Sequence, residues 1–232
     1  MLMEYASYEI KDNYLAPAEV KIGEAKTPVW IQQRWQEGEW ALYVRKNGCG
    51  HCCAAMALNL RGVAINPHEE YELCRRLWGA PRDEGERRQG NFQSSGGIKR
   101  ILNHFGVRAE CYGIPDREAA IRHILSALKD GKLVIFESHA RADNPDNPFS
   151  RGEHWVMAVG FTESGEILVA DSSELMGRAG YHLVDADTIM NALYLGADYE
   201  DMTWGEWRDD FLHGVCYLIV GDRAEDFIDK NV

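Results

Sequence analysis

Hydrophobic positions recur with helical spacing in the first part of the chain. After Cys49, apolar residues at 53, 54, 57, 58 and 60 predict a compact helix that ends at Gly62. Three more helices are predicted, over about 66–78, 97–105 and 116–131.

Capping residues support two of these helices. Asn66 can cap the helix at 66–78, Pro67 suits its first helical position, and Glu69 completes a pattern like a capping box. Asp116 is the predicted cap of the last helix, whose buried stripe ends at Gly131.

The spacing then changes to that of strands. Apart from one short extended segment at 29–35, the predicted strands lie at 133–136, 155–161, 167–169, 181–184 and 215–220, with a short helix near 187–195. Glu163-Ser164-Gly165 predicts a hairpin turn between the second and third of these strands. Helices followed by antiparallel strands indicate an α+β fold with segregated layers.

The length of 232 residues, 45% of them hydrophobic, favours one domain built of two lobes. We expect an N-terminal arm at 1–30, a helical lobe at about 31–131, a β lobe at about 132–221 and an acidic tail at 222–232. No apolar stretch has the length of a membrane span, and the first residues lack the features of a signal peptide. These features predict a cytoplasmic protein without membrane association, with secretion without a signal as the alternative.

The formal net charge is −12, and residues 184–232 carry twelve Asp or Glu against three Lys or Arg. An acidic protein repels phosphate backbones, so we expect no nucleic-acid partner and interpret the charge as a solvated surface. The sequence carries no signal for the oligomeric state.

Six cysteines, three of them within five residues, do not suit a disulfide framework. Cys74, Cys111 and Cys216 occupy apolar positions and are predicted to be buried.

Cys49 begins its predicted helix between Gly48 and Gly50, which leave room for a substrate to approach. Free amide groups and the positive end of the helix dipole favour the thiolate form of a cysteine at this position. A nucleophilic thiolate needs an imidazole partner. Of eight histidines, His154 is the best placed, because it opens a long apolar strand after a turn-rich loop, while His139 is a minor candidate.

A third residue should orient the imidazole. Asp171 ends the next strand of the same predicted hairpin, which would return it to the start of the strand of His154. Acyl transfer also requires donors for the oxyanion, commonly a backbone amide and a side-chain amide. Alternation along the extended segment directs only one of Gln32 and Gln33 toward the cleft, and we favour Gln33.

Together these residues resemble the papain-like cysteine peptidases, in particular the bacterial branch similar to the domains that process double-glycine bacteriocin leaders. That branch typically has a Gln, which resembles Gln33 here, followed by Gly-Cys-Gly, which resembles residues 48–50. Its next motif, Ala-Met-Val-Leu-Asn, resembles residues 55–59. The resemblance spans about residues 28–220. It implies a two-lobe papain-like fold, with the Cys-bearing helix in the N-terminal lobe and an antiparallel sheet in the C-terminal lobe. It also implies a Cys49–His154–Asp171 triad with Gln33, a peptide or protein substrate, and no cofactor or metal.

Several alternatives remain open from the sequence. The papain-like register would make Cys52 the nucleophile, although the Ala-Met spacing favours Cys49. Residues 49–52 also match the Cys-Gly-His-Cys tetrad of disulfide isomerases, but that motif should follow a buried strand. A metal site formed by Cys49, Cys52, Cys53 and a histidine is possible, but no second cysteine pair with zinc-like spacing exists. An acyltransferase, a deamidase or a non-catalytic interaction protein could share the same fold.

Overall fold

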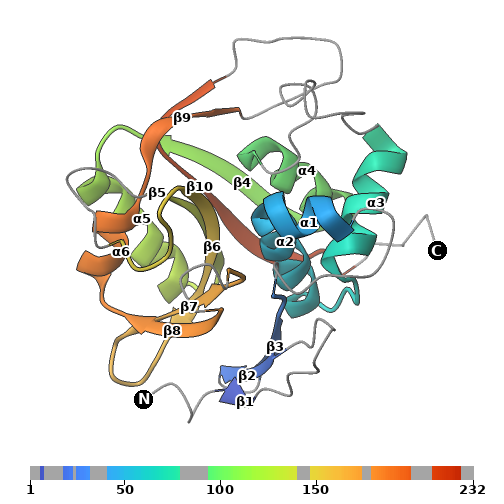
Figure 1. Ribbon diagram of the computed structural model, residues 1–232. Coiled ribbons are helices and arrows are strands. Elements are labelled where there is room, and N and C mark those ends of the chain that lie inside the picture. Colours follow the sequence, from blue (N-terminus) through green and yellow to red (C-terminus); the bar gives the residue numbers. More distant parts are fainter. Residues whose placement is uncertain are drawn as a thin grey trace.

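The computed structural model describes residues 6–7, 18–22, 25–31, 41–78, 94–139, 147–173, 179–199 and 211–225. Within these ranges a seven-stranded antiparallel sheet forms the centre of the molecule (Figure 1). Its order is β4-β10-β5-β6-β7-β8, and β9 also pairs with β10. The strands are β4 (Val107–Ile114), β5 (Leu133–His139), β6 (Glu153–Phe161), β7 (Ile167–Asp171), β8 (Gly180–Val184), β9 (Leu195–Tyr199) and β10 (Phe211–Arg223).

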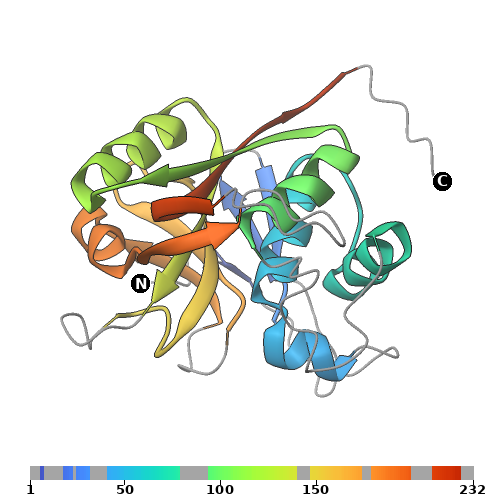
Figure 2. The ribbon, with the colours of Figure 1, turned by 90° about the horizontal axis from the view of Figure 1, so that it is seen from above.

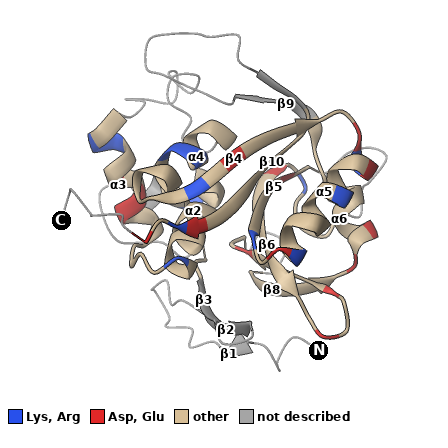
Figure 3. Ribbon diagram, turned by 180° about the vertical axis from the view of Figure 1, so that it is seen from behind, with Lys and Arg blue, Asp and Glu red and all other residues tan. Residues whose placement is uncertain are grey.

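Helices cover both faces of this sheet, as the view from above shows (Figure 2). On one face lie α2 (Cys49–Leu60) and α4 (Ser95–His104), with α1 (Ala41–Asn47) and α3 (Pro67–Trp78) packed outside α2. On the other face lie α5 (Arg117–Lys129) and α6 (Ala186–Ala192). Each face therefore has its own hydrophobic core. The helical layers carry acidic and basic residues interspersed among the described elements (Figure 3).

Helix α2 is the most buried helix among those described. All nine residues from Gly50 to Leu58 are buried, because α2 lies between β6 on one side and α3 and α4 on the others. A helix that is apolar around its whole circumference is stable only in such surroundings.

The Asn59 side chain holds the end of α2 in place. It accepts a hydrogen bond from Trp30 Nε1 at 2.8 Å, and its own Nδ2 donates to the carbonyl groups of Val63 at 2.8 Å and Ile65 at 2.9 Å. One side chain thereby joins the helix to the segment after β3 and to the loop after α2.

The predicted α+β class is confirmed, with the Cys-bearing helix in a helical layer and an antiparallel sheet beside it. The capping box is present, since Asn66 Oδ1 accepts from the Glu69 amide and Glu69 Oε2 accepts from the Asn66 amide, both at 2.9 Å. Asp116 accepts from the amide of Ala119 at 2.7 Å as the cap of α5. Gly165, with φ of +85°, forms the predicted hairpin turn. The division between lobes at residue 131 stays a prediction.

Three features were not predicted. Helix α1 has only seven residues, too few for a clear helical period. Strand β4 buries fully only Val107 and Ala109, so its alternation is weak, and it places a strand within the range expected to be helical. Two strands of a small antiparallel sheet, β1 (Ala6–Ser7) and β2 (Ala18–Ile22), lie in the predicted arm beside β3 (Ala25–Val29). Within the described ranges, no helix has the length and apolarity needed to cross a bilayer.

Replacing Asn59 by alanine tests its role at the end of α2. The change removes three hydrogen bonds, each contributing about 1 kcal/mol, so the free energy of unfolding should fall by about 2–3 kcal/mol in urea denaturation. Asn103→Ala is the matched control, because it removes the bond that Asn103 accepts from the Ala109 amide and should cost about 1 kcal/mol. Equal losses in the two variants would contradict this role.

Candidate active site

Cys49 is the first residue of α2, directly after the short helix α1. Gly48 connects the two helices, and its amide donates to the carbonyl of Val44 at 2.8 Å. A Cβ on Gly48 would collide with that carbonyl, so the packing of α1 explains this glycine better than substrate access does. The connection leaves the Cys49 side chain half-buried at the start of a buried helix.

His154 and Asp171 form a buried pair at the ends of two neighbouring inner strands of the sheet. His154 is the second residue of β6 and Asp171 the last residue of β7, and the hairpin brings them together as predicted. Nε2 of His154 donates to Oδ1 of Asp171 at 2.7 Å. The same oxygen accepts from the Ser173 amide at 2.8 Å, which fixes the carboxylate. The exposed fractions are 5% for His154 and 0% for Asp171.

His154 also forms a hydrogen bond with the Cys49 side chain, so it lies between the thiol and the carboxylate. Because Nε2 is bonded to Asp171, Nδ1 is the nitrogen left for the sulfur. Burial lowers the pKa of His154, but the hydrogen bonds with Asp171 and Cys49 and the negative charges of both outweigh it and raise this pKa from 6.5 to about 10. The site thus favours an imidazolium beside the sulfur, the arrangement that a cysteine nucleophile requires.

The other cysteines of the cluster occupy a different environment. Cys52 and Cys53 are fully buried, and burial, followed by the neighbouring Cys49, raises the pKa of both thiols well above the usual value. None of the six cysteines forms a disulfide. Cys49 is therefore partly accessible, whereas Cys52 is enclosed and its thiol keeps its proton. The residues before Cys49 form helix α1, whereas a disulfide-isomerase tetrad is expected after a buried strand.

A loop contact near His154 was not predicted. Ser138 is the register partner of His154 in β5, and its Oγ accepts from Nδ2 of Asn147 at 2.9 Å. Oδ1 of Asn147 accepts from the Phe149 amide at 2.9 Å. The Asn-Pro dipeptide at 147–148 signals a turn, but the sequence does not indicate that this turn bonds to β5 beside the histidine.

Of the remaining candidates, Gln33 and the reserve Gln32 lie outside the described residues. His139 ends β5, where its ring packs edge-on against Tyr194 at a centroid distance of 4.9 Å. The predicted burial is found for Cys74 and Cys216, while Cys111 is only partly buried.

Comparisons with known proteins show the family of this chain. Residues 27–203 match the sequence profile of the Peptidase_C39 like family. Among solved structures, a C39-like peptidase from Bacillus anthracis is similar at 13% sequence identity, with a TM-score of 0.46, covering 77% of this chain and 90% of that one. No protein of curated function matches the chain significantly.

The exposure of the cysteines predicts which thiol reacts. An electrophilic thiol probe should label Cys49 first, so Cys49→Ala should abolish rapid labelling, while Cys52→Ala should largely retain it because that thiol is buried and protonated. Peptide mapping by mass spectrometry locates the label. Rapid labelling that survives in Cys49→Ala and disappears in Cys52→Ala would move the nucleophile to Cys52.

The raised pKa of His154 predicts how the site titrates. In the wild type the imidazolium should persist until the pH rises through about 10. Asp171→Asn removes a hydrogen-bonded carboxylate, so the pKa of His154 should fall and the imidazole should lose its proton at lower pH. NMR of labelled histidine side chains measures both titrations. Asp185→Asn, which alters the cap of α6, is the control and should leave His154 unchanged. An unchanged pKa in Asp171→Asn would contradict the pairing.

Proposed function

This chain belongs to the Peptidase_C39 like family, and on that premise we propose that it is a cysteine peptidase that uses Cys49, His154 and Asp171 to cleave a peptide or amide bond. The observation that carries the proposal is His154, which hydrogen-bonds Asp171 through Nε2 and also hydrogen-bonds the thiol at the start of α2. Membership of a peptidase family implies a peptide as the substrate.

In the first half-reaction, the sulfur of Cys49 attacks the carbonyl carbon and a tetrahedral oxyanion forms. His154 then donates its proton to the leaving amine, the carbon–nitrogen bond breaks, and a thioester remains on Cys49. In the second half-reaction, His154 takes a proton from water, which attacks the thioester and releases the acid. Asp171 keeps the imidazole oriented and stabilises its positive charge in both halves.

The oxyanion requires hydrogen-bond donors. Cys49 is the first residue of α2, and the N-terminus of a helix directs backbone N–H groups outward and favours negative charge there. In our proposal the Cys49 amide supplies one donor and the side chain of Gln33 supplies the other. Removal of a single such donor in other enzymes costs about a hundredfold to a thousandfold in kcat.

Cleavage of a complex peptide library, followed by mass spectrometry of the products, tests the proposed function. The wild type should generate new termini, Cys49→Ala should generate none, and Gln33→Ala should be slower by about a hundredfold or more. Cys52→Ala is the matched control on the same helix and should cleave as the wild type does.

Other outcomes would identify other chemistry. Conversion of Gln to Glu without chain cleavage would indicate a deamidase, and transfer of the acyl group to an added amine would indicate a transferase, both on the same thioester. Reduction of insulin disulfides, dependent on Cys49 and Cys52, would contradict the peptidase proposal.

A further inference from the structure

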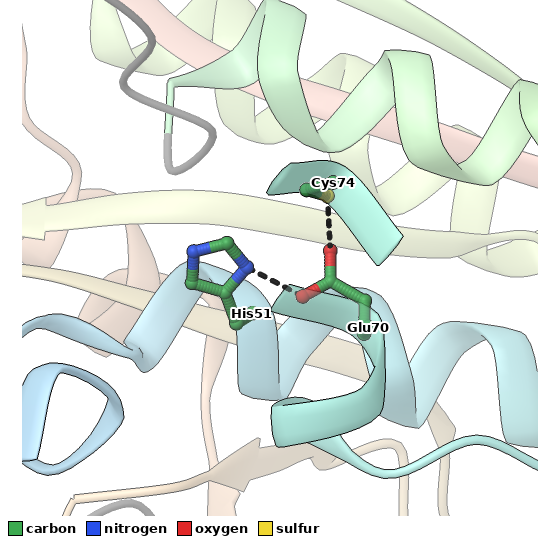
Figure 4. Close-up of side chains that lie close together, drawn as sticks. All are labelled: His51, Glu70 and Cys74. Carbon is green, nitrogen blue, oxygen red and sulfur yellow. Dashed lines mark hydrogen bonds and ion pairs between the residues drawn. The ribbon is translucent and has the colours of Figure 1, made fainter. Parts of the chain in front are cut away.

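A second cluster of reactive side chains lies behind the nucleophile helix. His51 belongs to the first turn of α2, and Glu70 and Cys74 lie four residues apart on one face of α3 (Figure 4). All three have an exposed fraction of 0%. None of them takes part in the proposed peptidase mechanism.

The three side chains converge on one point. Nδ1 of His51 donates to Oε2 of Glu70 at 2.5 Å, and Sγ of Cys74 donates to Oε1 of the same carboxylate at 3.3 Å. One nitrogen, one oxygen and one sulfur atom from the three residues all lie within 4.8 Å of one another. The ring of Tyr71 packs edge-on against His51 at a centroid distance of 4.9 Å. Within the described ranges, no other group of three His, Cys, Asp or Glu residues converges in this way.

The chemistry of these atoms suits a divalent transition metal. An imidazole nitrogen, a carboxylate oxygen and a thiolate sulfur form a mixed set that borderline zinc accepts, whereas magnesium and calcium prefer oxygen ligands alone. The charges also balance, because a neutral imidazole, one carboxylate and one thiolate together carry two negative charges. A site that becomes neutral with a divalent cation avoids the cost of an uncompensated charge in the interior.

We propose that His51, Glu70 and Cys74 bind one zinc-like divalent cation between α2 and α3. The metal site considered from the sequence, at the cysteine cluster 49–53, lacks a second cysteine pair, whereas the ligand set proposed here needs only one cysteine. When the cation binds, it replaces the thiol proton of Cys74, and Nδ1 of His51 turns from Glu70 to the cation while the ring proton moves to Nε2. Three protein ligands leave one tetrahedral position for water or a further ligand.

The cluster lies close to the proposed nucleophile, so a metal bound there would affect how the start of α2 is held. His51 is two residues from Cys49 on the same helix. A metal held by α2 and α3 would therefore fix the first turn of the nucleophile helix against its neighbour. This site is independent of the peptidase proposal, since its ligands are not the residues of the triad.

Cobalt binding tests the site in the Cys49→Ala background, which removes the other thiol that lies beside an imidazole. After treatment with a chelator, the protein should bind one Co²⁺ per chain and show a thiolate-to-cobalt charge-transfer band. Adding Cys74→Ser should abolish the band, and Glu70→Gln should weaken binding by more than about tenfold. Cys216→Ser removes another buried cysteine that forms no disulfide, on β10, and is the matched control that should retain the band. Failure to bind cobalt, or a band that persists in Cys74→Ser, would overturn the proposal.

X-ray absorption of the zinc-loaded Cys49→Ala protein provides a measurement that does not depend on folding of the Cys74 variant. One sulfur at about 2.3 Å, with the remaining ligands nitrogen or oxygen at about 2.0–2.2 Å, is the expected coordination. No sulfur, or two sulfurs, would overturn the assignment. Neither measurement uses peptidase activity, so the outcome is separate from that of the proposed function.

Discussion

The burial of α2 on every side is the constraint on which the site depends. From Gly50 to Leu58 no residue of this helix reaches the surface, so any displacement would open voids against β6, α3 and α4. Cys49 at the start of the helix lies at the boundary of the core, as Asn59 and Leu60 do at its end. Packing along the whole helix therefore positions the thiol, and Asn59 at the far end holds the helix against sliding.

The sheet positions His154 and Asp171, the two partners of the thiol. In an antiparallel hairpin the start of one strand lies beside the end of the next. The local pairing of β6 with β7 is therefore enough to bring His154 and Asp171 together. This pairing was predictable from the apolar runs and the Gly165 turn. The register shift between Ala158 and Gly160 was not, because a bulge depends on how the strands pack and twist.

Local signals account for most of what the sequence predicts about the fold. The caps at Asn66 and Asp116 act within three residues, so the sequence alone determines them. By contrast, the bond between His51 and Glu70 joins residues 19 apart on two helices, and the sequence does not specify the angle at which those helices pack. Glu70 on a buried face was the available signal, since a carboxylate is seldom buried without a partner.

The two cysteines of the Cys-Gly-His-Cys tetrad look equivalent in the sequence but differ in burial in the structure, because they lie one helical turn apart on α2. One helical turn spans about 5.4 Å, which is enough to move a side chain from the edge of a core into its interior. Cys49 lies at that edge beside an imidazole, whereas Cys52 is enclosed and remains a thiol. Disulfide exchange needs access at both sulfurs, and of the two cysteines of the tetrad only Cys49 is partly exposed. The histidine between them bonds to α3, so it does not serve the thiol next to it in sequence. The tetrad is therefore divided between two environments, one at the edge of the core and one closed within it.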